Sequence, residues 1–440
     1  MKQYVILILA FCLCSIGQIK ADDKINTQED FIILTGKVLD SKTRVPLYFA
    51  SVNLENTNIS NVTNSEGIFS LKISLKTSSE SKILISHLGY STFSAYITQF
   101  KNSSLNNPLI IEMVSVPLKL DPASIREEDP IALFDQAYNK IKNNYPQESI
   151  GMTAFYREVI KKGSKFLSLN EAILDIDKAP YNAFSSDKVG IYKGRGSVNY
   201  DSSDTLFIYY KGGAMSSLQI DLIKNPFAGV YLESVHRYYK FKMGKSVTID
   251  DKIFYVVEFN QNEEAENELL YRGKIYIESE SLAIGRLEFA MNVEGNDEAV
   301  NIFVPKRPHN LNVKVEVANY IVNFKEYNGL WYYDSAKMEV EFSTRRKMAI
   351  FRNYYNIVSE IAITDHKKGE FKINPECRIK YKDIMSEKIT SFTDEDFWEN
   401  YNIIEPDPTI DNIINKIVKQ LSKYLLKGFK TFEEINNKNK

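Results

Sequence analysis

The 440-residue chain is poor in cysteine, histidine and tryptophan, with 3, 4 and 2 copies respectively. Cys12 and Cys14 lie in an apolar segment at the N-terminus, which leaves Cys377 for the rest of the chain. A single thiol excludes an intramolecular disulfide framework and a cysteine-based metal site. Because no histidine or asparagine follows Cys377 at a suggestive spacing, we expect it to be a small, inert, buried thiol.

A strong charge of either sign is also missing, because 55 basic residues face 57 acidic ones and the net charge is -2. The chain therefore has no basic field for nucleic acid, and the balance favours neither an acidic nor a basic partner. A chain of this length exceeds one typical domain, so we expect two or more.

Long apolar runs are absent except for Tyr4–Ile16, which is shorter than the roughly 20 residues of a membrane-spanning helix. Lys2 precedes this run and small residues follow it, as in a secretory signal peptide. We predict a signal peptide over residues 1–21, cleaved after Gly17 or Ala21. Phe11 and Leu13 precede the two cysteines, which disfavours a lipoprotein cleavage site. The mature protein is thus expected in the periplasm, or on the outer membrane or cell surface.

Residues 36–90 alternate apolar and polar side chains in short runs, a period typical of half-buried strands. Val52 and Leu54 lie in one such run, and Phe69, Leu71 and Ile73 lie in another. Between the runs, the segment 64–67 reads Asn-Ser-Glu-Gly, which favours a turn with positive φ at the glycine. The pattern predicts a small β-sandwich over residues 31–115.

The order of these residues resembles a known family, the carboxypeptidase regulatory-like domain. The matching positions are Gly36-x-Val38-x-Asp40, Pro46-Leu47, Ala50-x-Val52, Thr63-Asn64-x-x-Gly67-x-Phe69 and Ser86-x-x-Gly89-Tyr90. Asn64 departs from the aspartate that is frequent in the family, with equivalent turn chemistry. The resemblance implies a transthyretin-like (prealbumin-like) sandwich, common in envelope proteins of Bacteroidota.

The remainder divides into a linker and helix over 116–150, a large antiparallel β domain over 151–370, and a tail with a C-terminal amphipathic helix over 371–440. Asp129-Pro130 is typical of a helix start, and Ile131, Phe134 and Ala137 then recur at helical spacing. Strand patterns follow one another from Thr153, and Asn328-Gly329 predicts a hairpin turn. The fold class is therefore mainly β, with a large curved sheet or half-barrel and a few helices.

A second resemblance covers nearly the whole mature chain. It is to a Bacteroidota family in which a carboxypeptidase regulatory-like domain precedes a β-rich domain, and it implies an envelope location without supplying catalytic residues. The matching segments are 155–158 (FYRE), 169–172 (LNEA), 178–181 (KAPY), 191–195 (IYKGR) and 396–406 (DFWENYNIIEP).

No catalytic or metal-binding set emerges from the residue pattern. The four histidines (His87, His236, His309 and His366) lack a second His or Glu at the spacing of a zinc site. The segment 194–197 (GRGS) is neither a serine-nucleophile elbow nor a phosphate loop, and we expect a turn there. The carboxylates of 263–268 and 394–396 read as solvated loops, without a calcium pattern. We predict no catalytic, cofactor-binding or metal site.

Two features leave alternatives open. Residues 273–289 and 320–333 resemble the half-barrel of periplasmic lipoprotein-sorting carriers, whose concave face holds an acyl chain. The helix that follows Asp407 has an apolar stripe flanked by lysines, which suits either a cover for the sheet or a membrane surface.

The sequence favours a non-catalytic exported envelope protein, in which a docking or adhesion sandwich precedes a β domain that binds an unknown protein, lipid or glycan. A lipid or lipoprotein carrier is the alternative, and a peptidase-related enzyme is the third interpretation. Neither the partner nor the oligomeric state follows from the sequence.

Overall fold

The structure, a computed structural model, confirms the mainly β fold class. The predicted signal peptide, most of the linker and the C-terminal helix from residue 416 lie outside the described residues. The structure describes residues 31–116, 129–198, 213–225, 227, 230–265, 268–294, 297–304, 307, 309–381, 383–389, 395–398 and 401–415.

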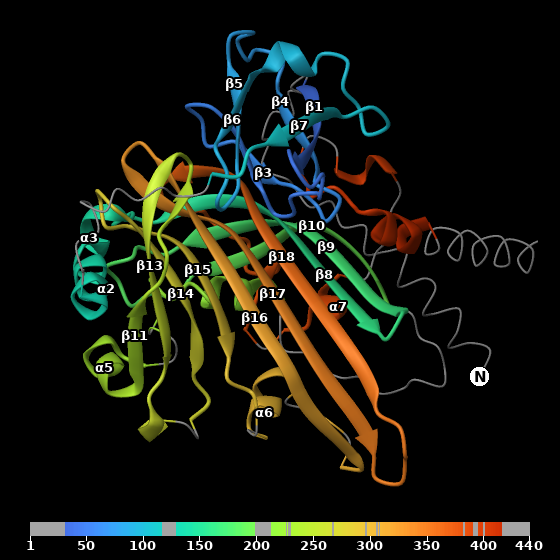
Figure 1. Ribbon diagram of the computed structural model, residues 1–440. Helices are drawn as coiled ribbons and strands as arrows, with labels where there is room; N and C mark the ends of the chain where they lie inside the picture. The colour runs from blue at the N-terminus through green and yellow to red at the C-terminus, as the bar shows by residue number, and fades with distance from the viewer. Residues whose placement is uncertain are drawn as a thin grey trace, which may run out of the picture.

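The N-terminal unit is a β-sandwich, drawn in blue at the top of Figure 1. Its three-stranded sheet has the order β4-β1-β7, and its four-stranded sheet has the order β3-β2-β5-β6. Val38, Phe69 and Ile111 are fully buried between the sheets, as the alternating pattern requires. The elements are β1 (Phe31–Asp40), β2 (Ser51–Leu54), β3 (Ser60–Val62), β4 (Ile68–Ser74), β5 (Lys82–Ser86), β6 (Phe93–Tyr96), the 3-10 helix η1 (Ile97–Phe100) and β7 (Leu109–Met113).

The turn before β4 has the predicted form. Gly67 has φ +72°, and Asn64 Oδ1 accepts hydrogen bonds from the backbone N–H groups of Glu66 and Ile68 at 3.0 and 2.9 Å. A Cβ atom on Gly67 would lie 2.3 Å from the carbonyl oxygen of Val38. Both the backbone angle and the close approach therefore require glycine.

The second unit is built on a 12-stranded antiparallel sheet that does not close into a barrel. The strand order is β11-β13-β14-β15-β16-β17-β18-β8-β9-β10-β19, with β12 paired to β13, so that β18 returns to lie beside β8. The strands are β8 (Ile150–Lys162), β9 (Lys165–Lys178), β10 (Lys188–Val198), β11 (Tyr239–Met243), β12 (Val247–Ile249), β13 (Lys252–Gln261), β14 (Tyr271–Glu278), β15 (Ile284–Met291), β16 (Leu311–Tyr327), β17 (Leu330–Arg346), β18 (Asn353–Lys368) and β19 (Arg378–Ile379).

The predicted hairpin at Asn328-Gly329 is confirmed, because it joins β16 to β17 with φ values of 50° and 76°. After this turn, residues 330–346 form the single long strand β17. The predicted turn at 194–197 is wrong, because these residues lie within β10. Small residues at Gly194 and Gly196 let Ile389 pack against the strand, which explains their presence in an extended segment.

One face of the large sheet, here called the helix face, packs against short helices. They are α2 (Pro130–Asn139), α3 (Ile141–Asn144), α4 (Gly213–Gln219), α5 (Val235–Tyr238), α6 (Ala299–Phe303) and α7 (Met385–Lys388), with 3-10 helices η4 (Leu232–Ser234), η5 (Glu263–Ala265) and η6 (Glu395–Trp398) elsewhere in the chain. Asp129 caps α2 as predicted, accepting a hydrogen bond from the Ile131 N–H at 3.0 Å. The predicted buried face was wrong at Ile131, which is 41% exposed, whereas Leu133 is fully buried.

The opposite face, here called the sandwich face, is covered by the N-terminal sandwich and by the tail. Phe49 and Val62 of the sandwich join Phe155 of β8 and Trp398 and Ile404 of the tail in one apolar cluster. Figure 1 shows the sandwich standing across the upper end of the sheet.

The tail then enters a helix at residue 408, and Asp407 caps it by accepting a hydrogen bond from the Ile410 N–H at 2.9 Å. Ile410 and Ile413 pack on Val159 and Leu169, so the described part of this helix covers the sheet. No helix among the described residues combines the length and the apolar character needed to cross a bilayer.

Candidate functional site

A row of mostly charged side chains crosses the sandwich face, with one residue in register from each of the nine neighbouring strands β13–β18 and β8–β10. It begins with Glu258, Lys274 and Glu288 in β13–β15, passes Ile321 in β16, and continues through Lys337, Glu360, Arg157, Glu171 and Arg195 in β17, β18 and β8–β10. The sign alternates on each side of Ile321, which places opposite charges on neighbouring strands. We call this set the charge row.

The last three members of the charge row form a buried ion network. Glu171 Oε1 lies 2.6 Å from Arg157, and Glu171 Oε2 lies 2.7 Å from Arg195. Burial alone raises the pKa of Glu171, but the two guanidinium groups outweigh it and hold the pKa below its ordinary value. Arg157 also donates a 2.8 Å hydrogen bond to the carbonyl of Ile404, which ties the tail to the sheet.

The sandwich contributes Tyr48 to the middle of the charge row. The Tyr48 hydroxyl donates a hydrogen bond to Glu360, and the Lys337 ammonium lies 4.5 Å from the centroid of the Tyr48 ring. Burial and the Glu360 carboxylate raise the pKa of Tyr48, so the phenol stays protonated as a donor. One side chain therefore connects the sandwich to both signs of the row.

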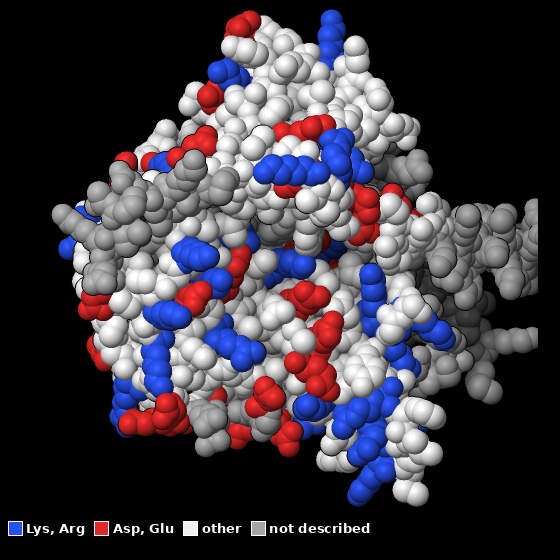
Figure 2. All heavy atoms as spheres, in the orientation of Figure 1, with Lys and Arg blue, Asp and Glu red and all other residues white. Residues whose placement is uncertain are grey.

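A cavity of about 200 Å³ lies between the sandwich, the sheet and the tail at this point. Its lining residues are Tyr48, Asn64, Ser65, Arg157, Val159, Lys161, Lys337, Asn356, Val358, Glu360, Glu405, Asp407 and Ile410. Figure 2 shows a hollow below the sandwich where Lys, Arg, Asp and Glu side chains meet. The cavity is thus polar, with aromatic and aliphatic patches.

The carboxylates of the cavity already have partners within the protein. Glu360 accepts from Tyr48, and Asp407 accepts from Ser65 at 2.7 Å. Burial raises the pKa of Glu405, while a hydrogen bond from Ser70 opposes the increase. The cations differ, because within the described part of the chain no carboxylate forms an ion pair with Lys161 or Lys337. The cavity therefore offers two ammonium donors, on Lys161 and Lys337, that no carboxylate of the described residues neutralises.

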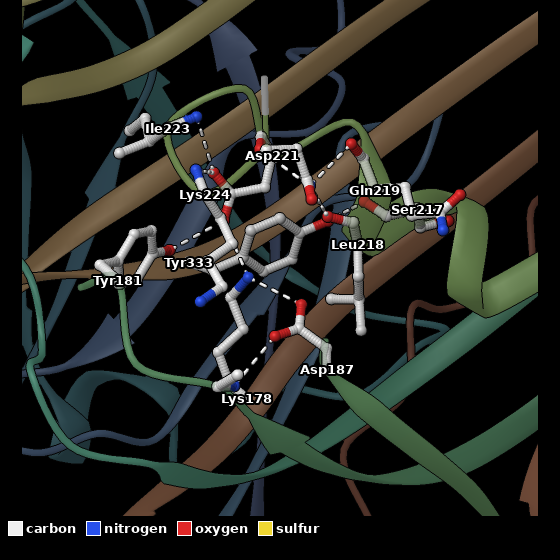
Figure 3. Close-up of polar contacts among 12 residues, drawn as sticks. Lys178, Tyr181, Asp187, Ser217, Leu218, Gln219, Asp221, Ile223, Lys224 and Tyr333 are labelled. Atoms are coloured by element: carbon white, nitrogen blue, oxygen red, sulfur yellow. Dashed lines mark hydrogen bonds and ion pairs between the residues drawn. The ribbon is translucent and has the colours of Figure 1, made fainter. Parts of the chain in front are cut away.

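A second polar cluster lies on the helix face and is drawn in Figure 3. The ammonium of Lys178, at the end of β9, lies 2.9 Å from Asp187 and 2.8 Å from Asp221. Tyr181 donates a 2.9 Å hydrogen bond to Asp221. Tyr333 of β17 donates a 2.6 Å hydrogen bond to the carbonyl of Ser217 in α4.

This cluster fixes α4 and the loop after it to the sheet. Burial lowers the pKa of Lys178, but Asp187 and then Asp221 outweigh that effect and hold the pKa above its ordinary value. The ammonium is fully buried and remains charged only because both carboxylates are present. We call Lys178, Asp187 and Asp221 the buried anchor.

The four histidines lie apart in the fold. His236 pairs with Asp135 at 3.0 Å on the surface, and His366 stacks on the Tyr332 ring at 4.4 Å. His87 is in the sandwich, against the sheet, and His309 lines an open cavity beside α6. Among the described residues no group of three or more His, Cys, Asp or Glu is arranged to hold a metal ion. The absence of a zinc site remains a prediction.

The structure corrects the prediction for Cys377 and describes only part of the carboxylate segment 394–396. Cys377 is exposed, contrary to the prediction of a buried thiol, because it lies in the turn that precedes β19. The carboxylate segment 394–396 falls partly outside the described residues, and the loop at 263–268 begins with the 3-10 helix η5.

The charge row and the buried anchor were missed as sites, although four of their residues lie in the segments of the second resemblance. Those segments supply Arg157, Glu171, Lys178 and Arg195, and the tail segment supplies Glu405. The signal in the sequence that could have indicated these clusters was the presence of charged residues within strands of alternating apolar residues. Their pairing depends on strand register, which a single sequence does not specify.

The chain was compared with known proteins. Residues 34–116 match the family model of the CarboxypepD_reg-like domain. No curated protein matches the chain.

Two solved structures with some likeness are a putative outer membrane lipoprotein-sorting protein domain from Vibrio parahaemolyticus and a LolA superfamily protein from Nitrosomonas europaea. The first has 10% identity and a TM-score of 0.25, covering 56% of this chain and 96% of its own. The second has 9% identity and a TM-score of 0.21, covering 54% and 94%. These TM-scores are too low to establish a shared fold.

The family match at residues 34–116 shows that the N-terminal sandwich is similar to the CarboxypepD_reg-like domain, as its sequence pattern predicted.

Proposed function

We propose that the protein is a non-catalytic, exported cell-envelope protein whose sandwich is a docking module fixed on the large sheet. In this proposal the cavity between the two units binds an acidic ligand, such as a peptide carboxylate. Export is inferred from the N-terminal segment, and the non-catalytic role is inferred from the lack of an assembled catalytic set in the sequence.

The observation that supports this function most directly is the composition of the cavity. Its carboxylates are occupied by the protein itself, whereas Lys161 and Lys337 have no carboxylate partner among the described residues. A ligand carboxylate would accept hydrogen bonds from both ammonium groups, and charge-assisted bonds of this kind are the stronger ones. The Tyr48 ring, which lies against Lys337, adds an apolar wall.

The rigidity of the surroundings also supports a binding role. Ser60 donates a 2.7 Å hydrogen bond to the carbonyl of Ile363, and Lys325 donates a 2.6 Å hydrogen bond to Asn53. Asn61 donates a 2.8 Å hydrogen bond to the carbonyl of Ile403 in the tail. Because these hydrogen bonds join the sandwich to the sheet and to the tail, a ligand would meet a preformed site.

The test is calorimetric titration with a panel of short acidic peptides and with their amidated forms. We expect binding of the acidic forms that weakens at least about tenfold in Lys161→Gln and in Lys337→Gln. Lys76→Gln, an exposed lysine of the sandwich outside the cavity, is the matched control and should bind normally. Equal binding of the acidic and amidated peptides, or wild-type affinity in both variants, would refute the cavity as the site. Turnover of a peptide, ester or glycan that is lost in a point variant would refute the non-catalytic role.

A second candidate function, an acyl-chain carrier, is favoured by the apolar helix face. Leu218 of α4, Phe134 of α2 and Phe303 of α6 are buried with the sheet in one cluster. Displacement of such helices would expose an apolar surface of the kind that an acyl chain covers. The buried anchor opposes that displacement, so a carrier would have to break it.

Native mass spectrometry of protein recovered from cell envelopes separates the two functions. Co-purified acyl lipid that increases in Lys178→Met, where the anchor is broken, would support the carrier. An apo mass in both the wild type and the variant would count against it, while leaving the cavity test above unaffected.

A further inference from the structure

The connection between β17 and β18 exposes apolar side chains to an unusual degree. Met348, Ile350 and Phe351 are 97%, 87% and 84% exposed. All three lie within the six residues 347–352 that separate the two strands. A single exposed apolar residue is common, but a contiguous group at one protrusion marks an interaction site.

The same connection is rich in cations. Arg345 and Arg346 end β17, Lys347 follows, and Arg352 precedes β18, with no acidic residue from 345 to 352. Arg352 donates a 2.9 Å hydrogen bond to Ser343. Figure 2 shows Lys and Arg gathered at the lower right, where the end of this hairpin projects, with uncharged atoms beside them. The apolar apex therefore has a basic collar.

The fold holds this apex away from the rest of the protein. Register pairs run from Tyr327↔Leu330 to Leu311↔Arg346, so that β16 supports β17 along its whole length. The Lys347 N–H donates to the carbonyl of Asn310 at 3.0 Å, and the Ala349 N–H donates to the carbonyl of Arg346 at 2.9 Å. In Figure 1 the tip extends below and to the right of the sheet. The exposed side chains are thus presented on a supported strand pair.

The neighbouring β8–β9 turn extends the basic collar. The Gly163 N–H donates a 2.9 Å hydrogen bond to the carbonyl of Tyr354, which is itself 60% exposed. Lys162 and Lys165 flank that turn. Cations therefore surround exposed aromatic and aliphatic groups over both hairpin ends.

We propose that the tip at residues 345–352 docks on the surface of a membrane that contains anionic phospholipid. The apex is convex and apolar, which suits shallow insertion at the boundary between headgroups and acyl chains. Arg345, Arg346 and Lys347 lie at its base, where lipid phosphates would meet them. The surface of an anionic bilayer matches both the apolar apex and the positive charge around it. This inference does not depend on the cavity between the sandwich, the sheet and the tail.

The experiment uses the chain as recovered from cells and measures flotation with vesicles. One vesicle type contains phosphatidylglycerol with phosphatidylethanolamine, and the other contains phosphatidylcholine alone. We expect binding to the anionic vesicles that falls at least about tenfold in the triple variant Met348→Ser, Ile350→Ser, Phe351→Ser. The triple variant Arg345→Gln, Arg346→Gln, Lys347→Gln should fall similarly, and added salt should weaken the wild type.

Phe184→Ser is the matched control, because Phe184 is a fully exposed aromatic residue in a different loop. It should bind like the wild type. Phe351→Trp provides a second readout, with a blue shift and increased intensity of its fluorescence on the anionic vesicles.

Three results would overturn the proposal. They are wild-type flotation in both triple variants, no fluorescence change of Phe351→Trp with either vesicle, and loss of a self-associated species, rather than of vesicle binding, in the apolar triple variant. Unchanged thermal unfolding of the variants is expected, since the substituted side chains contact solvent.

Discussion

The Tyr48 hydroxyl of the sandwich donates a hydrogen bond to Glu360 of β18, a residue 312 positions later in the chain. This contact places a tyrosine between two members of the charge row and makes the sandwich part of the same buried polar network as the sheet.

Tyr48→Phe should destabilise the protein by about 1–2 kcal/mol, because the buried Glu360 carboxylate loses a hydrogen-bond donor. Urea unfolding at neutral pH measures the change. Tyr96→Phe is the control, since Tyr96 is 45% exposed, and it should change the unfolding free energy by less than about 0.5 kcal/mol. Equal effects of the two substitutions would contradict the role of the Tyr48 hydroxyl.

Lys178→Met should be more damaging, by about 3–5 kcal/mol, because it leaves Asp187 and Asp221 buried beside each other without a cation. Lys188→Met is the matched control. Lys188 also bridges two carboxylates, but Lys188 is 40% and Glu370 64% exposed, so the loss should be smaller than in Lys178→Met, where all three groups are buried. Denaturant unfolding of both variants tests the difference, and a similar loss in each would show that burial of the anchor is unimportant.

Gly67→Ala should destabilise the sandwich by more than about 2 kcal/mol, since its Cβ would lie 2.3 Å from the Val38 oxygen at φ +72°. Gly89→Ala separates the steric contact from the strain of a positive φ, because Gly89 has φ +80° but no atom within 4 Å of an added Cβ. Only the conformational cost of about 1 kcal/mol should remain there. Equal melting temperatures for the two variants would exclude the steric contact as a cause.

The partly buried His366 and the buried Asp334 should give opposite pH dependence of stability. Burial lowers the pKa of His366 to about 4, so the unfolded chain binds the proton first and stability is lost as the pH falls from 6.5 towards 4. Burial raises the pKa of Asp334 to about 6, although Lys325 opposes the increase. The folded state keeps that proton longer, so this contribution falls as the pH rises from 3.8 to 6.

His366→Gln should therefore flatten the gain in stability on raising the pH, whereas Asp334→Asn should steepen it. The effect at His366 should be about 1–2 kcal/mol, because its partial exposure screens the shift. Unfolding free energies measured across this pH window test both slopes. Parallel curves for the wild type and the two variants would show that neither group titrates differently on folding.

The local structure of the sandwich was predictable because its signals are short-range. The alternation around Phe69 and Leu71 and the positive φ of Gly67 depend on neighbours in sequence. The same holds for the Asn328-Gly329 turn and for the Asp129 cap of α2. In each of these, the residue type restricts the backbone directly.

The site was not predictable, because it depends on distant pairing. Lys337, Glu360 and Arg157 become neighbours only through the β17–β18 and β18–β8 registers. The sequence around Tyr48 did not indicate its contact with Glu360, since a tyrosine near Pro46 is compatible with many positions on a protein surface. The prediction of a buried thiol at Cys377 rested on residue type alone, whereas the residue lies in an exposed turn before β19.

The pairing of β18 with β8 also sets an order of folding. β8 is made early, but its partner strand, residues 353–368, is made about two hundred residues later. Until then β8 can pair with β9 on one side, but its other edge is open and able to pair with another chain. The contacts of Ser60 with Ile363 and of Tyr48 with Glu360 wait for the same strand. Non-local pairing of this kind makes folding slow, so a newly made chain would depend on protection from aggregation until β18 is in place.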